Sequence, residues 1–330
     1  MQYRLVIQLS ELKTENNVSK VSVVVPIFNE AGNLREFVSR VRSVLEEKSQ
    51  SFEILFVVDP STDGSDEMIR QMSSEDPRIT ALVFSRRVGQ PTATLAGLEN
   101  CSGDAAIVMD CDLQDPPELI PKLIEEWEKG FDVVYARRTR RVGETLVKRA
   151  VAKVGYAVID RFGDVKIPRD TGDFRLLNRR VIDQLARFPE THGFLRGLVA
   201  LVGFSQTEVP FERPARHSGQ GHYNRFFGSL RIGFNGVIAF SSALLNLSTI
   251  LGFVAAGSSF VLGFSYLALK ALGVNFPVGN PTVVVIISLI GGLQLICLGI
   301  IGQYIGRIYD EVKRRPRYIV DYRISGGQRN

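Results

Sequence analysis

Two aspartates separated by one residue, Asp110 and Asp112, are the side chains best suited to chemistry in this sequence. They follow the apolar run 105–109, which predicts a buried strand, and Pro116 and Pro117 end the stretch behind them. In extended backbone both carboxylates would point to the same side, where they repel each other unless a cation lies between them. Hard oxygen ligands suit Mg²⁺ or Mn²⁺. A solvated acidic turn is the alternative, but the preceding strand favours a metal site at a strand's carboxyl end, where open α/β sheets bind ligands.

Strands that alternate with helices would position this stretch. Apolar or β-branched runs followed by turn residues predict strands at 21–26, 52–58, 79–84, 105–109, 133–136 and 205–213. Apolar residues at helical spacing, or capping and turn residues, predict helices at 34–45, 65–72, 90–98 and 194–202. This alternation predicts an α/β fold, a mostly parallel sheet flanked by helices. Dinucleotide binding is the first alternative for such a fold, but no G-x-G-x-x-G follows the first strand.

Charge is distributed unevenly along the 330 residues. Between Arg231 and Arg307 the only charged residue is Lys270, and the segments 240–269 and 282–305 each exceed the ~20 apolar residues that span a bilayer. A buried hairpin of a soluble core is the alternative, but uncharged segments of this length are rare there. Because basic residues flank the pair on both sides, the positive-inside rule predicts that both chain ends are cytoplasmic.

The remaining composition fits a cytoplasmic membrane protein. The chain has a modest net charge of +5, and seven basic residues fall between positions 137 and 153. These seven form either a solvated face or a surface for lipid headgroups and a phosphate. This placement near the apolar region favours a membrane over nucleic acid. The three cysteines show neither a disulfide framework nor metal spacing. Residues 1–20 are mixed and polar, so we expect a flexible lead and not a signal peptide.

Four motifs occur together: VSVVVPIFNE at 21–30, VDPSTDGS at 58–65, DCDLQDPPE at 110–118 and TGDFR at 171–175. Their combination resembles the polyprenyl-phosphate glycosyltransferases, relatives of dolichol-phosphate-mannose synthase with a GT-A type catalytic domain. The run 291–316 resembles the bacterial branch with two membrane helices, which includes undecaprenyl-phosphate glucosyltransferases. The resemblance covers about residues 20–320. With the lead at 1–20, it implies a cytoplasmic GT-A domain at 21–223, an interfacial helix at 224–240, two transmembrane helices at 241–306 and a basic cytoplasmic tail at 307–330.

The resemblance also implies roles for individual residues. Residues implied to bind the donor are Pro26, Phe28, Glu30, Asp59, Asp110, Gln114 and Arg216. Those implied to hold Mg²⁺ or Mn²⁺ are Asp110 and Asp112, and those expected to receive the acceptor phosphate are Arg137, Arg138, Lys148 and Arg149.

Asp173 and Arg175 are the expected catalytic pair, because Asp173 stands where related sugar transferases often keep a base. Whether Asp173 removes a proton or orients Arg175 stays open. Proton removal predicts that Asp173→Asn is impaired at pH 6 and partly recovers by pH 8.

The sequence departs from the family pattern at two places. Val58 and Pro60 stand where the family has Asp and Gly, and Gly221 and His222 stand where it has Ser and Lys. A neutral histidine binds phosphate less well than a lysine does. These departures put part of the donor site in question.

The function implied is inverting transfer of one hexose, with glucose from UDP-glucose favoured, to polyprenyl phosphate at the cytoplasmic face of the bacterial inner membrane. A processive polysaccharide synthase is one alternative, but the sole tryptophan, Trp127, lies outside the Gln-x-x-Arg-Trp motif of such enzymes. A non-catalytic nucleotide-sugar-binding scaffold is the other. The segment 317–322 alternates like an edge strand that pairs with a neighbouring subunit. We therefore expect a homo-oligomer and take a tetramer as the working assumption.

Overall fold

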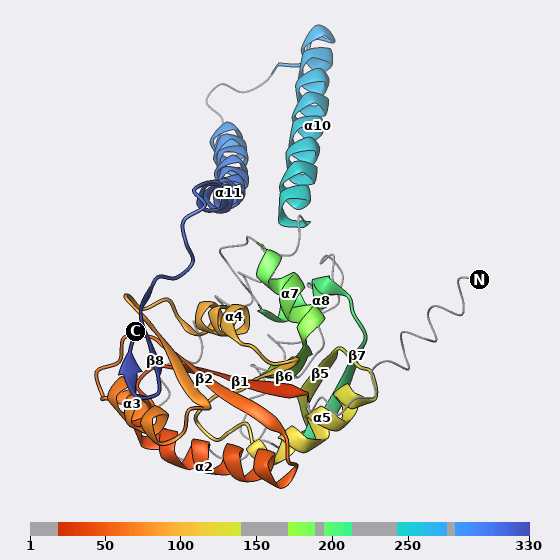
Figure 1. Cartoon of the computed structure of the whole chain (residues 1–330). Coiled ribbons are helices and arrows are strands. Elements are labelled where there is room, and N and C mark those ends of the chain that lie inside the picture. Colours follow the sequence, from red (N-terminus) through yellow and green to blue (C-terminus); the bar gives the residue numbers. More distant parts are fainter. Residues whose placement is uncertain (1–18, 140–170, 189–194, 213–242, 276–280) are drawn as a thin grey trace, which may run out of the picture. The chain divides into compact units, whose positions relative to one another are not determined.

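The computed structural model describes residues 19–139, 171–188, 195–212, 243–275 and 281–330 (Figure 1). The described residues belong to two compact units. The sheet unit holds those up to position 212 and those from 316 onward, and the helical unit holds 243–275 and 281–315.

The sheet unit begins with strands and helices in alternation. Its elements are β1 (Lys20–Ile27), α2 (Ala31–Glu47), β2 (Ser51–Val58), α3 (Ser65–Glu75), β3 (Ile79–Phe84), α4 (Gln90–Asn100), β4 (Ala105–Val108), η1 (Pro117–Leu119), α5 (Ile120–Glu128), β5 (Val133–Arg138), β6 (Thr171–Asn178), α7 (Arg179–Arg187), α8 (Leu195–Val202), β7 (Gln206–Phe211), β8 (Val320–Ser325) and β9 (Gln328–Arg329).

The described strands form one sheet in the order β7-β5-β6-β4-β1-β2-β3-β8-β9. Its centre is parallel, because β1 pairs in parallel with both β2 and β4, and β2 with β3. Strand β6 enters antiparallel between β4 and β5. The order reverses at β1, whose neighbours are the second and fourth strands of the chain, and ligands bind at the carboxyl ends of strands at such a point. The predicted α/β fold is confirmed.

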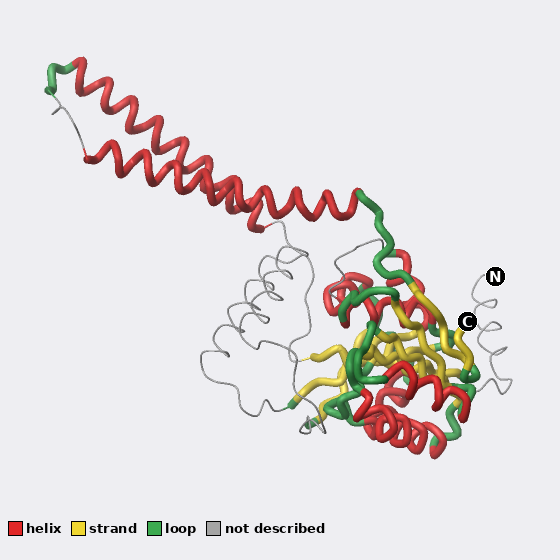
Figure 2. Tube along the Cα trace, turned by 90° about the vertical axis from the view of Figure 1, so that its left-hand side faces the viewer, coloured by secondary structure: helices red, strands yellow, loops and turns green. Residues whose placement is uncertain are grey.

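Helices cover both faces of this sheet (Figures 1 and 2). Helices α2, α3 and α5 lie on one face, where alternate strand residues such as Val23 and Ile54 join their apolar sides in the main core. Helix α4 lies on the other face with α7. It packs so closely that a Cβ at Gly97 would overlap Val24 and Val57, which explains the glycine.

A half-buried carboxylate holds the amino ends of the central strands. Glu53 accepts hydrogen bonds from Lys20 Nζ at 2.7 Å, from Ser22 Oγ at 2.6 Å, and from both the backbone N–H and Oγ of Ser102 at 2.7 Å. Burial raises the pKa of Glu53, but these donors outweigh it and lower the pKa to about 2. The carboxylate is therefore ionised in the folded protein and joins β1, β2 and the turn before β4.

The C-terminal segment, expected as a basic tail, contains the end of a helix and a strand of the sheet. Helix α11 continues to Val312, and β8 then pairs antiparallel with β3, in a register that sets Ala81 opposite Ile324. The predicted edge strand therefore exists and pairs with the sheet of its own chain. The homo-oligomer stays a prediction. Alternation identifies a strand and does not specify its partner.

The helical unit consists of α10 (Ala243–Ala271) and α11 (Pro281–Val312). Both are long and apolar enough to cross a membrane, with mean hydropathies of 1.8 and 2.4 over their apolar spans. Only 6% and 0% of their most apolar windows are buried, which distinguishes them from core helices of a soluble protein. The two helices meet where Cys297 Sγ lies 3.7 Å from the carbonyl oxygen of Ser248. Such exposed apolar helices indicate association with a membrane. The interfacial helix expected at 224–240 lies outside the described residues.

Candidate active site

The D-x-D stretch lies in a turn, not in extended backbone. Strand β4 ends at Val108, one residue earlier than expected, and the turn carries Leu113 in the left-handed region with φ of 61°. The two aspartates therefore do not share a strand face: Asp110 is half-buried, whereas Asp112 is only 8% exposed. The expectation that alternation aligns them was wrong, because the strand has already ended.

Three hydrogen bonds hold this turn, one from α4 and two within the turn itself. Gln90 Nε2, at the first residue of α4, donates to Asp110 Oδ1 at 2.7 Å. Gln114 N donates to Asp112 Oδ1 at 3.1 Å, and the buried Asp115 accepts from the backbone N–H of Asp110 at 3.4 Å. Asp110 and Asp112 are thus oriented before any ligand binds.

Cys111, between the two aspartates, points into the core. Burial, together with the nearby carboxylates, raises the pKa of its thiol well above the ordinary value, so it stays protonated and apolar. It is a packing residue.

The carboxylate set fits a metal that is shared with a ligand. Among the described residues, no three His, Cys, Asp or Glu side chains come together as a metal-binding group. A closed protein cage is therefore absent from this part of the chain. Two carboxylates are the usual protein share for Mg²⁺ bound to a phosphate substrate, which supplies further oxygens along with water. Asp110 and Asp112 fit that arrangement.

The loops after β1 and β2 are joined side chain to backbone. Asn29, with φ of 55°, accepts from Thr62 N at 2.8 Å through Oδ1, and its own N–H donates to Ser61 Oγ at 3.1 Å. Asp63 Oδ2 accepts from Ala31 N at 2.8 Å. The motif segments 27–30 and 59–65 therefore form one surface at the carboxyl edge of the sheet.

The expected donor residues on these loops have different surroundings. Pro26 is half-buried within β1, and Glu30 accepts from Asn33 Nδ2 at 2.5 Å at the start of α2. The ring of Phe28 lies under the guanidinium of Arg87, 3.7 Å from Cζ to the centroid. The nucleoside role of these residues stays a prediction.

Asp59 supports a third loop. Its carboxylate is 3% exposed and accepts from Val88 N at 3.0 Å and Gly89 N at 2.9 Å. Both oxygens are thus engaged by the loop 85–89 between β3 and α4. Asp59 therefore fixes the loop 85–89 to the end of β2.

The second motif cluster lies on β6, opposite the end of β4. The register pairs Val108 with Arg175, so Asp173, two residues earlier on the antiparallel strand, comes level with the start of the D-x-D turn. The sheet thus brings TGDFR and D-x-D to one end although the sequence separates them by about sixty residues.

Two arginines hold Asp173. Arg196 Nε, from α8, donates to Asp173 Oδ1 at 3.0 Å, and Arg175 Nη2 lies 3.6 Å from the same oxygen. Burial raises the pKa of Asp173, but the charges of Arg196 and Arg175 outweigh it and hold the pKa below its usual range. Because the side chain is 34% exposed, a carboxylate that is ionised at neutral pH faces the site.

Arg175 is completely buried, and burial lowers the pKa of its guanidinium. Nη2 donates to Gly172 O at 2.7 Å, and the guanidinium lies 5.1 Å from the centre of the Tyr135 ring. Arg175 therefore holds the backbone of the motif in place and contributes positive charge beneath Asp173.

The two adjacent arginines at the end of β5 have separate roles. Arg137 Nε pairs with Glu208 Oε1 on β7 at 3.0 Å. Arg138 lies over Gly172, where an added Cβ would come 2.7 Å from its Nη2, and its charge lowers the pKa of Asp173. Of this pair, only Arg138 is brought to the Asp173 cluster. The other expected phosphate-binding residues, Lys148, Arg149 and Arg216, lie outside the described residues.

Sequence reasoning missed Gln90 and Arg196. Gln90 was visible only as the start of a helix before Pro91, and Arg196 only as a polar residue in the apolar run 194–202. A charged side chain inside an otherwise apolar helix is a signal that could have identified Arg196.

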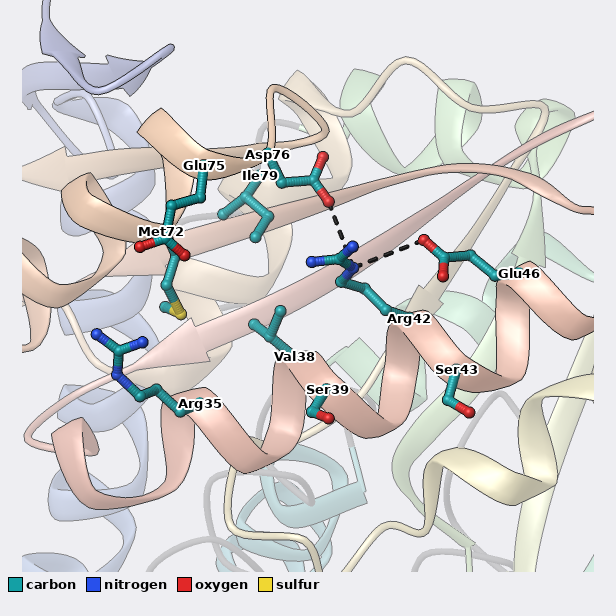
Figure 3. Close-up of a pocket in the computed structure, with 10 residues that line it drawn as sticks. All are labelled: Arg35, Val38, Ser39, Arg42, Ser43, Glu46, Met72, Glu75, Asp76 and Ile79. Atoms are coloured by element: carbon teal, nitrogen blue, oxygen red, sulfur yellow. Dashed lines mark ion pairs between the residues drawn. The ribbon is translucent and has the colours of Figure 1, made fainter.

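A hollow between α2 and α3 is separate from this cluster (Figure 3). It has a volume of about 410 Å³ and is lined by residues such as Val38, Ser43 and Met72. Arg42 reaches from α2 between Glu46 at 3.6 Å and Asp76 at 3.5 Å, so its charge is compensated. This polar network joins the two helices.

Comparison with known proteins gives consistent matches. The family model described as glycosyl transferase family 2 matches residues 22–186. An uncharacterized glycosyltransferase of Bacillus subtilis, YkcC, is 42% identical over 91% of this chain and 92% of its own. The bactoprenol glucosyl transferase of Shigella phage SfII is 38% identical over 91% of this chain and 97% of its own. Among solved structures, the mannosyltransferase PcManGT from Pyrobaculum calidifontis, in complex with GDP-Man and Mn²⁺, aligns with a TM-score of 0.46 at 15% identity, over 94% of this chain and 92% of that one.

Proposed function

The chain belongs to glycosyl transferase family 2, and from this premise we propose that it transfers a single glucose from UDP-glucose to a polyprenyl phosphate, with inversion, at the cytoplasmic face of a membrane. Relatives named bactoprenol glucosyl transferase, 36–38% identical over most of the chain, support the sugar and the lipid class. The observation that supports the chemistry best is the β4–β6 register. It brings the D-x-D turn level with the arginine-held Asp173 at one end of the sheet.

The donor would lie across the loops that follow β1, β2 and β4. The segment 27–30 and Asp59 would form the nucleoside side, while Gln114 and Arg216 would contact the diphosphate. Asp110 and Asp112 would hold a divalent cation, which when bound neutralises charge on the leaving diphosphate. The protein prepares this arrangement through Gln90, which holds one carboxylate oxygen of Asp110.

The acceptor is a phosphate whose second pKa is about 6, so at neutral pH it is already largely ionised. Its oxygen attacks the anomeric carbon as the bond from that carbon to the nucleoside diphosphate breaks, and the diphosphate leaves with the electron pair. The acceptor needs positioning more than deprotonation. Arg138 is the described residue best placed to bind it, and the basic residues Lys148 and Arg149 would extend this site.

Asp173 is proposed to orient and not to remove a proton. Its low pKa makes it a weak base, and its contacts with Arg196 and Arg175 make it a fixed negative point between cations. A catalytic base at this position would need a pKa nearer the working pH. The ion-paired environment supports the orienting role.

The two apolar helices would anchor the enzyme where its lipid acceptor resides. Basic residues outside both spans and one lysine between them support cytoplasmic chain ends. A lipid acceptor confined to the same bilayer would then reach the enzyme by lateral diffusion.

The test is transfer by the purified full-length protein in detergent, with Mg²⁺ or Mn²⁺, undecaprenyl phosphate and a panel of labelled nucleotide-sugars. We expect lipid-linked glucose and stoichiometric UDP from UDP-glucose. UDP release without a lipid product would contradict the acceptor, and product from another nucleotide-sugar alone would contradict the donor.

The metal assignment is tested in the same assay with Asp112→Asn. We expect at least a 10²-fold loss of transfer, because the leaving diphosphate loses its counter-charge. The matched control is Glu118→Gln, since Glu118 belongs to the same acidic stretch but pairs with Arg40 at 2.7 Å. Near-normal turnover of the Asp112→Asn protein in EDTA would refute a metal role.

A further inference from the structure

The segment that follows α11 contacts the start of the loop 85–89 and the last turn of α4. We name residues Pro316–Ser325, which lead into and form β8, the strap. The carbonyl oxygen of Ile319 accepts from Ser85 N at 3.0 Å, at the residue where β3 ends and the loop 85–89 begins. The ring of Tyr318 packs on Phe84, with centroids 5.2 Å apart.

The same part of the strap binds the last turn of α4. Tyr318 OH donates to Glu99 Oε2 at 2.8 Å and accepts from Asn100 Nδ2 at 3.1 Å. Arg317 forms an ion pair with the other oxygen of Glu99. The side chains of Arg317 and Glu99 are mostly buried, so solvent screens their charges only partly.

Between these two attachment points lies the segment that shapes the donor surface. Val88 and Gly89 donate to Asp59, and Gln90 donates to Asp110 in the D-x-D turn. Helix α4, with eleven residues and a length of about 16 Å, joins the last turn that the strap contacts to Gln90 at its first residue. The strap is therefore connected to Gln90 through α4, and to the loop 85–89 through Ser85 at the end of β3.

We infer that Arg317 and Tyr318 are positioning residues for the donor site, which act through Glu99 and α4 on Gln90 and through Ser85 on the loop 85–89. This inference rests on the proposed function for the identity of the donor. It assigns a role in the reaction to a segment more than two hundred residues from the D-x-D motif.

A purely structural strap would behave differently. Pairing with β3 covers an otherwise open sheet edge and would stabilise the fold wherever along the strand it was weakened. A positioning role is confined to the Arg317–Ile319 end. Strap variants of equal stability should therefore differ in donor affinity according to which end they alter.

The chain offers a matched pair of single-hydroxyl deletions. Tyr318→Phe removes the contacts with Glu99 and Asn100 and keeps the ring against Phe84. Tyr322→Phe removes a hydroxyl from the same strap that donates to Asp66 of α3 at 2.9 Å, and not to the loop 85–89 or α4. Both are made in the full-length protein in detergent.

The first readout is hydrogen exchange of the amides of Val88 and Gly89, which requires no substrate. Tyr318→Phe removes the hydrogen bond to the charged Glu99, a loss that typically corresponds to a factor of roughly ten. Transmitted through α4, it should raise the exchange of the two amides roughly tenfold, whereas Tyr322→Phe should not. The second readout is kinetic: Tyr318→Phe should raise KM for UDP-glucose about five- to tenfold with KM for undecaprenyl phosphate unchanged. Glu99→Gln, which weakens the same contact from α4, should reproduce both effects.

Unchanged exchange at 88–89 in both Tyr318→Phe and Glu99→Gln would overturn the inference, and so would equal effects of Tyr318→Phe and Tyr322→Phe. If the wild type transfers no glucose but the exchange difference is found, the proposed donor is wrong and the positioning role stands. If transfer occurs and the exchange is the same in every variant, the function stands and the positioning role fails.

Discussion

Replacing Asp173 by asparagine separates two accounts of the reaction. If Asp173 removes the residual proton of the acceptor, its loss matters most near pH 6, where the acceptor monoanion is abundant. If Asp173 orients cations, its loss matters equally at every pH at which it is ionised. The pKa of Asp173 lies below its usual range because the charges of Arg196 and Arg175 outweigh burial.

The expected magnitude follows from the geometry. Unit charges 3.6 Å apart, the Asp173–Arg175 separation, attract by roughly 4.6 kcal/mol at an effective dielectric of about 20. Since the carboxylate is one-third exposed, about half of this, roughly 2 kcal/mol, is a reasonable net value. If all of it maintains the arrangement of Arg175 and Arg196, Asp173→Asn loses about 30-fold in kcat.

The pH dependence is the sharper test. A carboxyl group with a pKa below about 3.9 is less than 1% protonated at pH 6, so the ratio of wild-type to mutant rates should be constant from pH 6 to 8.5. The measurement is glucose transfer against pH at saturating metal and donor. Asp183→Asn, an exposed carboxylate paired with Arg179 on α7, serves as the control with no effect. A ratio that falls tenfold or more between pH 6 and 8.5 would restore proton removal and refute the orienting role.

Three further predictions follow from the packing. Glu53→Gln should destabilise the sheet unit by roughly 3 kcal/mol, because the pKa of Glu53 is lowered from 4.5 to about 2. In the wild type this stability is present above pH 4.5 and is lost as the pH falls toward 2. Unfolding followed by the fluorescence of Trp127, the only tryptophan, measures both effects. Arg138→Ala should raise the KM for polyprenyl phosphate at least tenfold, whereas Arg137→Ala, which only removes a partner of Glu208, should stay within about twofold; equal effects in a titration of the acceptor would contradict the separation of the two arginines. A chain in which a flexible linker replaces 224–315 keeps the strap and should bind UDP. A chain that ends at 223 loses the strap as well and should bind UDP more weakly. Equal affinities by calorimetry would show that the strap is dispensable for nucleotide binding.

The fold was largely predictable because its strands are continuous apolar runs bounded by turn residues. Residues 21–26 and 52–58 are apolar almost throughout, which is typical of strands buried on both faces. Their alternation with helices makes a parallel sheet the simplest arrangement. The antiparallel entry of β6 was not foreseeable, since periodicity gives no strand direction. The partner of β8 was not foreseeable either, because β8 pairs across 243 residues, from Ala81 to Ile324.

The site was predictable in outline and not in its contacts. A strand followed by two aspartates located the D-x-D motif, but the turn depends on Leu113 and on Asp115 accepting from Asp110 N, which no spacing rule reveals. Arg196 and Asp173 are 23 residues apart, and only the packing of α8 brings them together.

The pairing of β8 with β3 has a consequence for how the protein is made. At a synthesis rate of 5–20 residues per second, roughly 10 to 50 s pass between the emergence of Ala81 and that of Ile324. During that interval the two apolar helices are synthesised, and β3 stays an open sheet edge able to pair with other chains. Contacts this distant in sequence form late and slow folding. Premature stop codons after α11 should therefore give a protein that enters the membrane with its sheet incomplete, and aggregation through β3 is the expected outcome.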